Sequence, residues 1–148
     1  MEVAGDSLQE GRASEAEGGV TDQHDRATLL VDAANVVGSR PNGWWRDRPG
    51  AARSLVDRVR SAVEAGRLAE PVVVVLEGRS RAGVEEGESS GVAVLHAAGS
   101  GDDLLVSVTS DAHGEVTLVS ADRALRERVV ALGADVVGPG WLLALLDG

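Results

Sequence analysis

Cysteine and lysine are both absent from the 148 residues of this sequence. Without cysteine, the protein can form neither a disulfide nor a thiolate metal site. No apolar run approaches the roughly 20 residues that cross a membrane, so no membrane-spanning segment is predicted. The amino-terminal residues lack the basic start and apolar stretch of a secretory signal. A cytoplasmic protein is therefore expected.

Acidic residues outnumber basic ones, and the net charge of the chain is -10. Proteins that coat nucleic acid non-specifically carry a basic balance instead, so this composition argues against a general coating role. Residues 1–26 hold seven acids against two arginines, which leaves -5 there. All fourteen basic residues are arginine. A bias toward GC-rich codons explains this, and recognition of phosphate by the forked guanidinium group is the second explanation.

Two parts of different composition follow one another along the chain. Residues 1–26 are rich in Gly, Glu, Ser and Ala and poor in large apolar residues. Their burial cannot offset the entropy lost on ordering them, so we expect a disordered acidic tail. Residues 27–148 carry enough apolar residues for one domain with its own core.

The apolar pattern of residues 27–148 alternates strands with helices. Residues 72–76 are five consecutive aliphatic residues, typical of a parallel strand that is covered on both faces. After Pro49, apolar residues recur at the spacing of a helix that Gly66 ends. Residues 36–49 and 78–91 are rich in glycine and polar residues, and we expect loops there, the second of them mobile. Further strands are predicted at 29–33, 92–96, 116–119 and 135–137, and further helices from 102, at 122–132 and at 141–146.

This alternation predicts an α/β fold, a three-layer sandwich with a central, mostly parallel, Rossmann-like sheet. Right-handed crossovers between parallel strands would place a reversal of the strand order near the first strand. Ligands of such sheets bind beyond the carboxyl ends of the strands, at this switch point. Polar residues that directly follow a strand are therefore the candidates for a functional site.

Acidic and amide side chains follow four of the predicted strands. Carboxylates that meet at one edge of a sheet repel one another unless a cation lies among them, and oxygen ligands suit Mg²⁺ or Mn²⁺. Capping of a helix or of a loop amide is the competing explanation for each acid. Three strand ends that each supply an aspartate favour one shared site. The candidates are Asp32, Asn35, Glu77, Asp102, Asp103 and Asp122.

Asp102 and Asp103 compete for one position in this site. Both open a predicted helix after Gly99-Ser100-Gly101, where an acid is favoured by the backbone dipole. We expect one of them to cap the helix and the other, Asp103, to face the site, because the apolar residues that follow would lie on the buried side.

Four short motifs lie in order between residues 29 and 137: Leu-Val-Asp-Ala-Ala-Asn, Val-Val-Val-Leu-Glu-Gly, Gly-Asp-Asp and Val-Thr-Leu-Val-Ser-Ala-Asp-Arg. In this order they resemble the NYN branch of the PIN-like nuclease superfamily, in particular its bacterial YacP-like members. The resemblance implies a three-layer PIN-like α/β domain and a ribonuclease that depends on Mg²⁺ or Mn²⁺. It implies a catalytic set of Asp32, Asn35, Asp103 and Asp122, with Asp102 and Glu77 as further metal ligands.

The sequence departs from the family pattern after the last motif. Many relatives carry a further acid there, where this chain has Arg123, Ala124 and Leu125. A one-metal enzyme and a domain that has lost part of its site therefore both remain open. The alternatives to a ribonuclease are a catalytically degenerate RNA- or protein-binding module and a small nucleotide phosphohydrolase, because a fold alone does not decide function.

Arginines and tryptophans near the strand ends are the candidates for contact with RNA, the expected partner. Arginine can hold phosphate, and an aromatic face can stack an unpaired base. Alternatively, the tryptophans fix a long loop to the core and the arginines form a solvated rim. The oligomeric state stays open, a homodimer included. The candidates are Arg40, Trp44, Arg46, Arg48, Arg79, Arg81 and Arg123.

Overall fold

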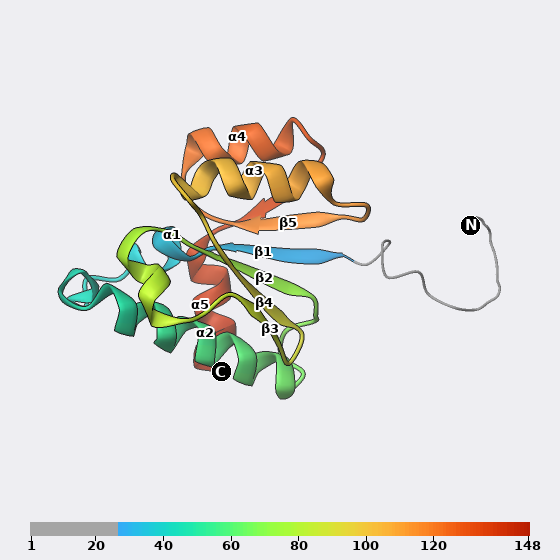
Figure 1. Ribbon diagram of the computed structural model, residues 1–148. Helices are drawn as coiled ribbons and strands as arrows, with labels where there is room; N and C mark the ends of the chain where they lie inside the picture. Colours follow the sequence, from blue (N-terminus) through green and yellow to red (C-terminus); the bar gives the residue numbers. More distant parts are fainter. Residues whose placement is uncertain (1–26) are drawn as a thin grey trace.

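The computed structural model describes residues 27–148 (Figure 1), so the disorder expected for residues 1–26 lies outside the described residues. No helix in the described part of the chain is long and apolar enough to cross a membrane. With η denoting a 3-10 helix, the elements are β1 (Thr28–Asp32), α1 (Ala33–Gly38), η2 (Trp44–Arg46), α2 (Arg48–Glu64), β2 (Val72–Leu76), η3 (Gly78–Gly83), β3 (Gly87–Ser89), β4 (Val92–His96), α3 (Gly101–Asp111), β5 (Val116–Val119), α4 (Arg123–Val130), β6 (Asp135–Val137) and α5 (Pro139–Asp147).

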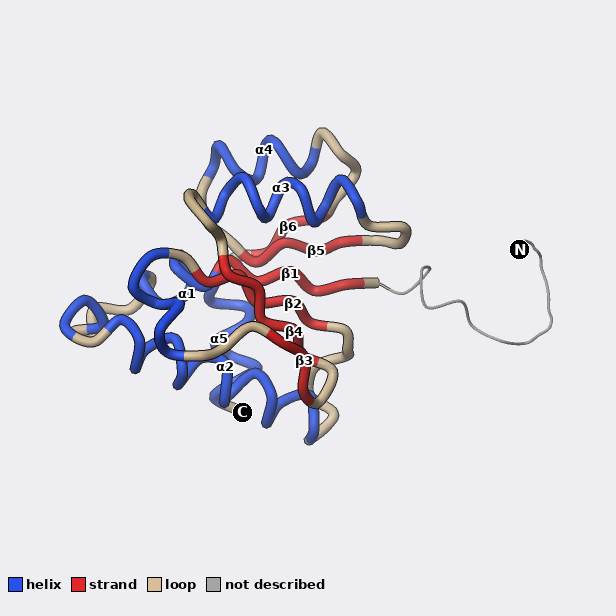
Figure 2. Tube along the Cα trace, viewed as in Figure 1, coloured by secondary structure: helices blue, strands red, loops and turns tan. Residues whose placement is uncertain are grey.

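The strands form one sheet in the order β3-β4-β2-β1-β5-β6. Neighbouring strands are parallel except for β3, which pairs antiparallel with β4. Figure 2 shows helices on both faces of this sheet, with α3 and α4 on one side and α2 and α5 on the other. The predicted α/β sandwich with a mostly parallel central sheet is thereby confirmed.

Two segments that were expected to be loops contain short regular structure. Residues 36–49 include the end of α1 and all of η2, and residues 78–91 include η3 and β3. The helix α1 begins because the Asp32 side chain accepts a hydrogen bond from the Asn35 amide. Strand β3 is fully exposed and exists through its pairing with β4. Neither the Asp32 cap nor the pairing with β4 appears in the apolar periodicity of the sequence, which is why α1 and β3 were missed.

Each face of the sheet has its own apolar core. On one face, Val56 of α2 and Leu142 of α5 pack with Val74 of β2 in one buried cluster. On the other face, Leu105 of α3 and Leu125 of α4 belong to a second cluster. The sheet thus lies between two apolar layers, which is why its central strands are nearly continuous in aliphatic residues.

The strand order reverses beside β1, as right-handed crossovers predicted. From β1 the chain adds β2 and β4 on one side, and then returns to add β5 and β6 on the other. The parallel strands all point toward the end of the sheet where α1 lies (Figure 1). Segments that follow β1, β2, β4 and β5 therefore gather at one edge.

The contact between η3 and the start of α2 leaves no room for a side chain. A Cβ placed on Gly83 would lie 2.1 Å from the carbonyl oxygen of Pro49. The Nε of Arg53 donates a hydrogen bond of 3.2 Å to the carbonyl of Gly83. The segment after β2 is therefore held directly against α2.

We expect Gly83→Ala to lower the free energy of unfolding by roughly 1–3 kcal/mol, because the new methyl group must displace backbone. Gly140→Ala on α5 is the matched control, since a Cβ there meets nothing within 4 Å. In a helix this control should be neutral or stabilising by up to about 1 kcal/mol. Urea unfolding monitored by circular dichroism measures both, and equal effects of the two variants would contradict the close contact.

Candidate active site

Asp32 lies at the centre of the strand-end site. It is the last residue of β1 and is only 8% exposed. One carboxylate oxygen accepts a hydrogen bond of 3.3 Å from the Asn35 amide, and the other accepts one of 2.9 Å from the Ser120 hydroxyl. The side chain is therefore both a helix cap and a fixed anionic group at the switch point.

Asn35 and Ser120 join the two sides of the switch point. The side-chain oxygen of Asn35 accepts a hydrogen bond of 2.8 Å from the backbone amide of Ala121, in the segment after β5. Ser120 is fully buried, and its oxygen also accepts a hydrogen bond of 3.1 Å from the Asp122 amide. Asn35 thus helps to hold the segment after β5 beside Asp32. Ser120 was missed as a site residue, although it is the polar residue that directly follows an apolar strand.

Glu77 follows β2 and holds the start of α3. Its Oε1 accepts a hydrogen bond from the backbone amide of Gly101. A Cβ on Gly101 would lie 2.6 Å from this oxygen, so glycine is what permits the contact. Glu77 therefore positions the helix that carries Asp102, in addition to contributing a carboxylate of its own.

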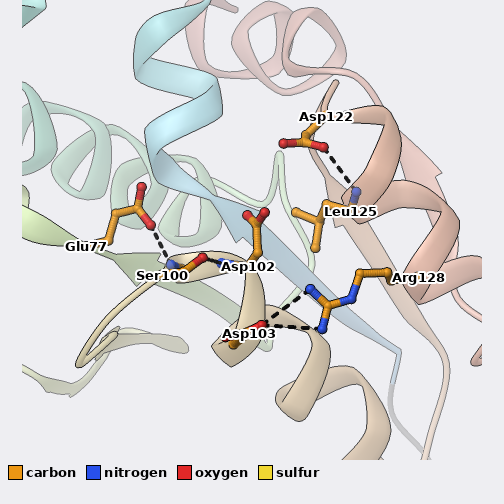
Figure 3. Close-up of polar contacts among 8 residues, drawn as sticks. Glu77, Ser100, Asp102, Asp103, Asp122, Leu125 and Arg128 are labelled. Atoms are coloured by element: carbon orange, nitrogen blue, oxygen red, sulfur yellow. Dashed lines mark hydrogen bonds and ion pairs between the residues drawn. The ribbon is translucent and has the colours of Figure 1, made fainter.

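Asp102 and Asp103 have different neighbours. Figure 3 shows Asp102 between Glu77 and Asp122, whereas Asp103 lies beside Arg128. The Asp103 side chain is 78% exposed, and its Oδ1 is 3.4 Å from Nη1 of Arg128.

The structure thus differs from the expectation that Asp103 faces the site. The reason is that the Ser100 side chain caps α3 by accepting a hydrogen bond of 3.1 Å from the Asp102 amide. Because neither aspartate is needed as the cap, Asp102 can face the other acids. Asp103, one position further around the helix, is directed to the surface.

Asp122 is the N-cap of α4. Its Oδ1 accepts a hydrogen bond of 3.0 Å from the Leu125 amide. The capping explanation therefore holds for this residue, as it does for Asp32. Capping occupies one oxygen in Asp122 and fixes the side chain near the other acids, so capping and a shared site are compatible here.

The acids at this edge of the sheet lie close enough to raise one another's pKa values. Burial raises the pKa of Asp32 to about 6, and Asp102 and Glu77 add to this rise, whereas hydrogen bonds from Ser120 and Asn35 oppose it. Burial also raises the pKa of Asp102, and Asp122 and Glu77 raise it further. Asp32, Asp102, Asp122 and Glu77 therefore form one electrostatic group, defined here as the acidic cluster.

The acidic cluster offers the oxygen donors that a hard divalent cation requires. Within residues 27–148, however, no three Asp, Glu or His side chains lie close enough to enclose a metal ion. Mg²⁺ is commonly held by one or two carboxylates together with waters and substrate phosphates. The donor set therefore fits a cation that water and substrate help to hold, and it does not form a closed protein cage.

Two of the arginines predicted to contact RNA instead form hydrogen bonds within the protein. Nη2 of Arg40 donates a hydrogen bond of 2.9 Å to Asp147 at the end of α5. Arg81 donates to the carbonyls of Gly78 and Ala97, at 3.1 and 3.2 Å. These arginines support the strand-end edge and are already engaged by the protein. Arg79 and Arg123 are exposed.

The remaining predicted contacts come from η2 and the first residue of α2. Arg46 lies 5.8 Å from the ring centroid of Trp45, and Arg48 lies 5.2 Å from that of Trp44. Trp45 is 51% exposed, whereas Trp44 is partly buried. Trp44 and Arg48 line a cavity of about 470 Å³ that Glu77 and Ser100 also line. This segment therefore lies next to the acidic cluster.

The architecture is an α/β sandwich in which acids gather beyond the carboxyl ends of the parallel strands. No family model matches the sequence, and no curated protein matches it significantly. Among solved structures, the chain is similar to a crystal structure of Rae1 (YacP) from Bacillus subtilis. The TM-score is 0.57 with 17% sequence identity, over 81% of this chain and 74% of that one. This likeness shows a YacP-like fold of the NYN and PIN-like type.

We expect Asp32→Asn to stabilise the metal-free protein at neutral pH. The pKa of about 6 in the folded protein exceeds the ordinary value of 3.8. The contribution of Asp32 to stability is therefore fully present below about pH 4, and it is lost as the pH rises through 6. At pH 7 the variant should be more stable than wild type by about 1–3 kcal/mol.

Urea unfolding in EDTA at acidic and at neutral pH measures this difference. Asp135→Asn is the control, since Asp135 begins β6 at the opposite edge of the sheet and is exposed. An advantage of Asp32→Asn that is the same at both pH values would contradict a raised pKa of Asp32 in the folded protein.

Proposed function

We propose that the protein is a Mg²⁺- or Mn²⁺-dependent endoribonuclease that hydrolyses phosphodiester bonds in single-stranded or exposed RNA. The observation that carries this proposal is the acidic cluster at the switch point, where burial and neighbouring carboxylates raise the pKa values of Asp32 and Asp102. Such a group of acids is stabilised by a cation. The order of the four sequence motifs and the YacP-like fold support the choice of RNA as substrate.

The residues of the acidic cluster take different parts in the proposed mechanism. One or two of the carboxylates of Asp32, Asp102 and Asp122 would hold the ion together with waters and the substrate phosphate, with Asp32 kept in place by Ser120 and Asn35. Glu77 fixes α3 through Gly101 and thereby positions Asp102. A bound Mg²⁺ or Mn²⁺ supplies Lewis acidity, which lowers the pKa of an attacking water and offsets charge on the phosphate. No side chain needs to form a covalent intermediate.

A non-catalytic RNA-binding module is the second candidate. The observation that favours it is the open spacing of the acids, since no three of them enclose a metal ion within residues 27–148. In addition, many relatives of the resembled family carry an acid shortly after the last motif, where this chain has Arg123, Ala124 and Leu125. A module of this kind would bind RNA without cleaving it, whether or not a divalent metal is present.

Asp102→Asn and Asp103→Asn are adjacent substitutions of identical chemistry, and only the first removes a member of the acidic cluster. With Mn²⁺ and labelled single-stranded RNA, we expect Asp102→Asn to lower cleavage by roughly 100-fold or more. Asp103→Asn should change it by less than about fivefold, because it removes only an exposed ion pair. The opposite order would move the catalytic role to Asp103. Absence of cleavage by wild type, across several RNAs, would favour the binding module.

Binding of the ion alone should be visible as a thermal shift. A ligand that binds only the folded state raises its stability by mass action, by about 2.7 kcal/mol at a hundredfold excess over Kd. We expect Mn²⁺ to raise the Tm of wild type and of Asp103→Asn, and to raise that of Asp32→Asn much less. An equal shift in all three proteins would place the ion outside the acidic cluster.

A further inference from the structure

A cavity beside the acidic cluster has the size of a small-molecule site. Its volume is about 470 Å³, and pockets for small ligands measure about 300–1,000 Å³. It lies between α1, η2 and the start of α2 on one side and the segments after β2 and β4 on the other. We call it the Trp44 cavity; its lining includes Trp44, Arg48, Glu77, Gly78, Ser80 and Ser100.

One wall of the Trp44 cavity is a stacked pair. The guanidinium carbon of Arg48 lies 5.2 Å from the ring centroid of Trp44. Arg48 is exposed, and it forms no ion pair with any other described residue. The wall therefore combines an indole ring with a guanidinium group that has no ion-pair partner among residues 27–148. Bases stack on aromatic rings and on guanidinium planes, and arginine holds phosphate.

The opposite side of the Trp44 cavity belongs to the acidic cluster. Glu77 and Ser100 line the cavity, and the same two residues fix the start of α3 by hydrogen bonds to the amides of Gly101 and Asp102. A ligand in the cavity would therefore lie directly beside the group of acids that includes Asp102.

The stacked wall is held at both ends. Asp47 caps α2 by accepting a hydrogen bond of 3.0 Å from the Gly50 amide. At the other end, Asp147 accepts hydrogen bonds from both Arg40 and Arg58. Trp44 lies between these two fixed points. A preformed wall lowers the ordering cost of binding, so the cavity suits a ligand whose main contribution is stacking.

We propose that the Trp44 cavity takes one unpaired nucleotide of the RNA strand, next to the phosphate at the acidic cluster. The base stacks on the Trp44–Arg48 pair, and the Arg48 charge faces the adjoining phosphate. A base inside a duplex is stacked on both faces and must first leave the helix. The inference rests on the proposed ribonuclease function and adds the place where one unpaired nucleotide of the substrate is held.

The first test measures binding without cleavage. A fluorescent single-stranded RNA hexanucleotide and the same RNA in a duplex are titrated with the protein in EDTA, with anisotropy as the readout. Trp44→Leu should weaken binding of the single strand by roughly 5–100-fold, since stacking of one base contributes about 1–3 kcal/mol. Trp44→Phe keeps an aromatic face and should retain most of the affinity. Trp141→Leu on α5, at 46% exposure, is the control and should bind as wild type does.

The salt dependence of binding separates the charge of Arg48 from stacking. Arg48→Gln should weaken binding and reduce the slope of log affinity against log salt by about one, because one phosphate contact is lost. Trp44→Leu should weaken binding with the slope unchanged. An unchanged slope in Arg48→Gln would overturn the placement of a phosphate at Arg48.

The outcomes distinguish this inference from the proposed function. Unchanged affinity in Trp44→Leu overturns the nucleotide site even if wild type cleaves RNA. Loss of affinity in Trp44→Leu with an unchanged Tm supports the site even if wild type cleaves nothing, in which case the ribonuclease proposal fails alone. If wild type binds duplex and single-stranded RNA with equal affinity, the proposal that the bound nucleotide must be unpaired is overturned. If a mononucleotide binds as tightly as the hexanucleotide, the ligand is a free nucleotide, and the proposal that the cavity takes a nucleotide of an RNA strand is overturned.

If Trp44→Leu lowers the Tm, its weaker binding could come from loss of structure. Trp44→Phe, provided that its Tm equals that of wild type, then tests stacking. Binding by this variant that is as weak as that of Arg48→Gln would then overturn stacking as the source of affinity, whereas binding close to wild type supports it.

Discussion

The buried carboxylate of Asp32 is the constraint on which the strand-end site depends. Strand β1 carries it to a position of 8% exposure, where a negative charge is costly unless it is hydrogen-bonded. Ser120 reaches it from the segment after β5, and the Asn35 side chain spans to that same segment. The bond from Ser120 therefore both stabilises this charge and joins the two sides of the sheet, so the fold itself sets the geometry of the acid.

The sheet could be predicted because aliphatic runs report burial on both faces. Residues 72–76 are such a run, and they form the buried strand β2 between β1 and β4. Strand β3 could not be predicted, since its three residues are all exposed and only their pairing with β4 makes them a strand. Helix α1 is six residues long and depends on the Asp32 cap, which leaves too short a stretch for helical periodicity to be visible.

For the site, the sequence indicated which acids follow strands but not where they point. Asp102 and Asp103 are adjacent and chemically identical, and their directions are set by Ser100, which caps the helix, and by Arg128, which is 25 residues away from Asp103. Ser120 contacts Asp32 across 88 residues of chain. The Trp44 cavity arises from five segments that meet only in the folded protein. The Ser100 cap is local, but the contacts between distant segments have no local signature.

The close approach of Gly83 to Pro49 has a kinetic consequence for a strand that passes the Trp44 cavity. It links η3, which supplies Gly78 and Ser80, to the start of α2, which supplies Arg48. The two walls are therefore joined by direct backbone contact. Exchange of one base for the next would need no opening of the protein. A base at the proposed site would then leave by unstacking, and a purine, which stacks more strongly, would leave more slowly than a pyrimidine.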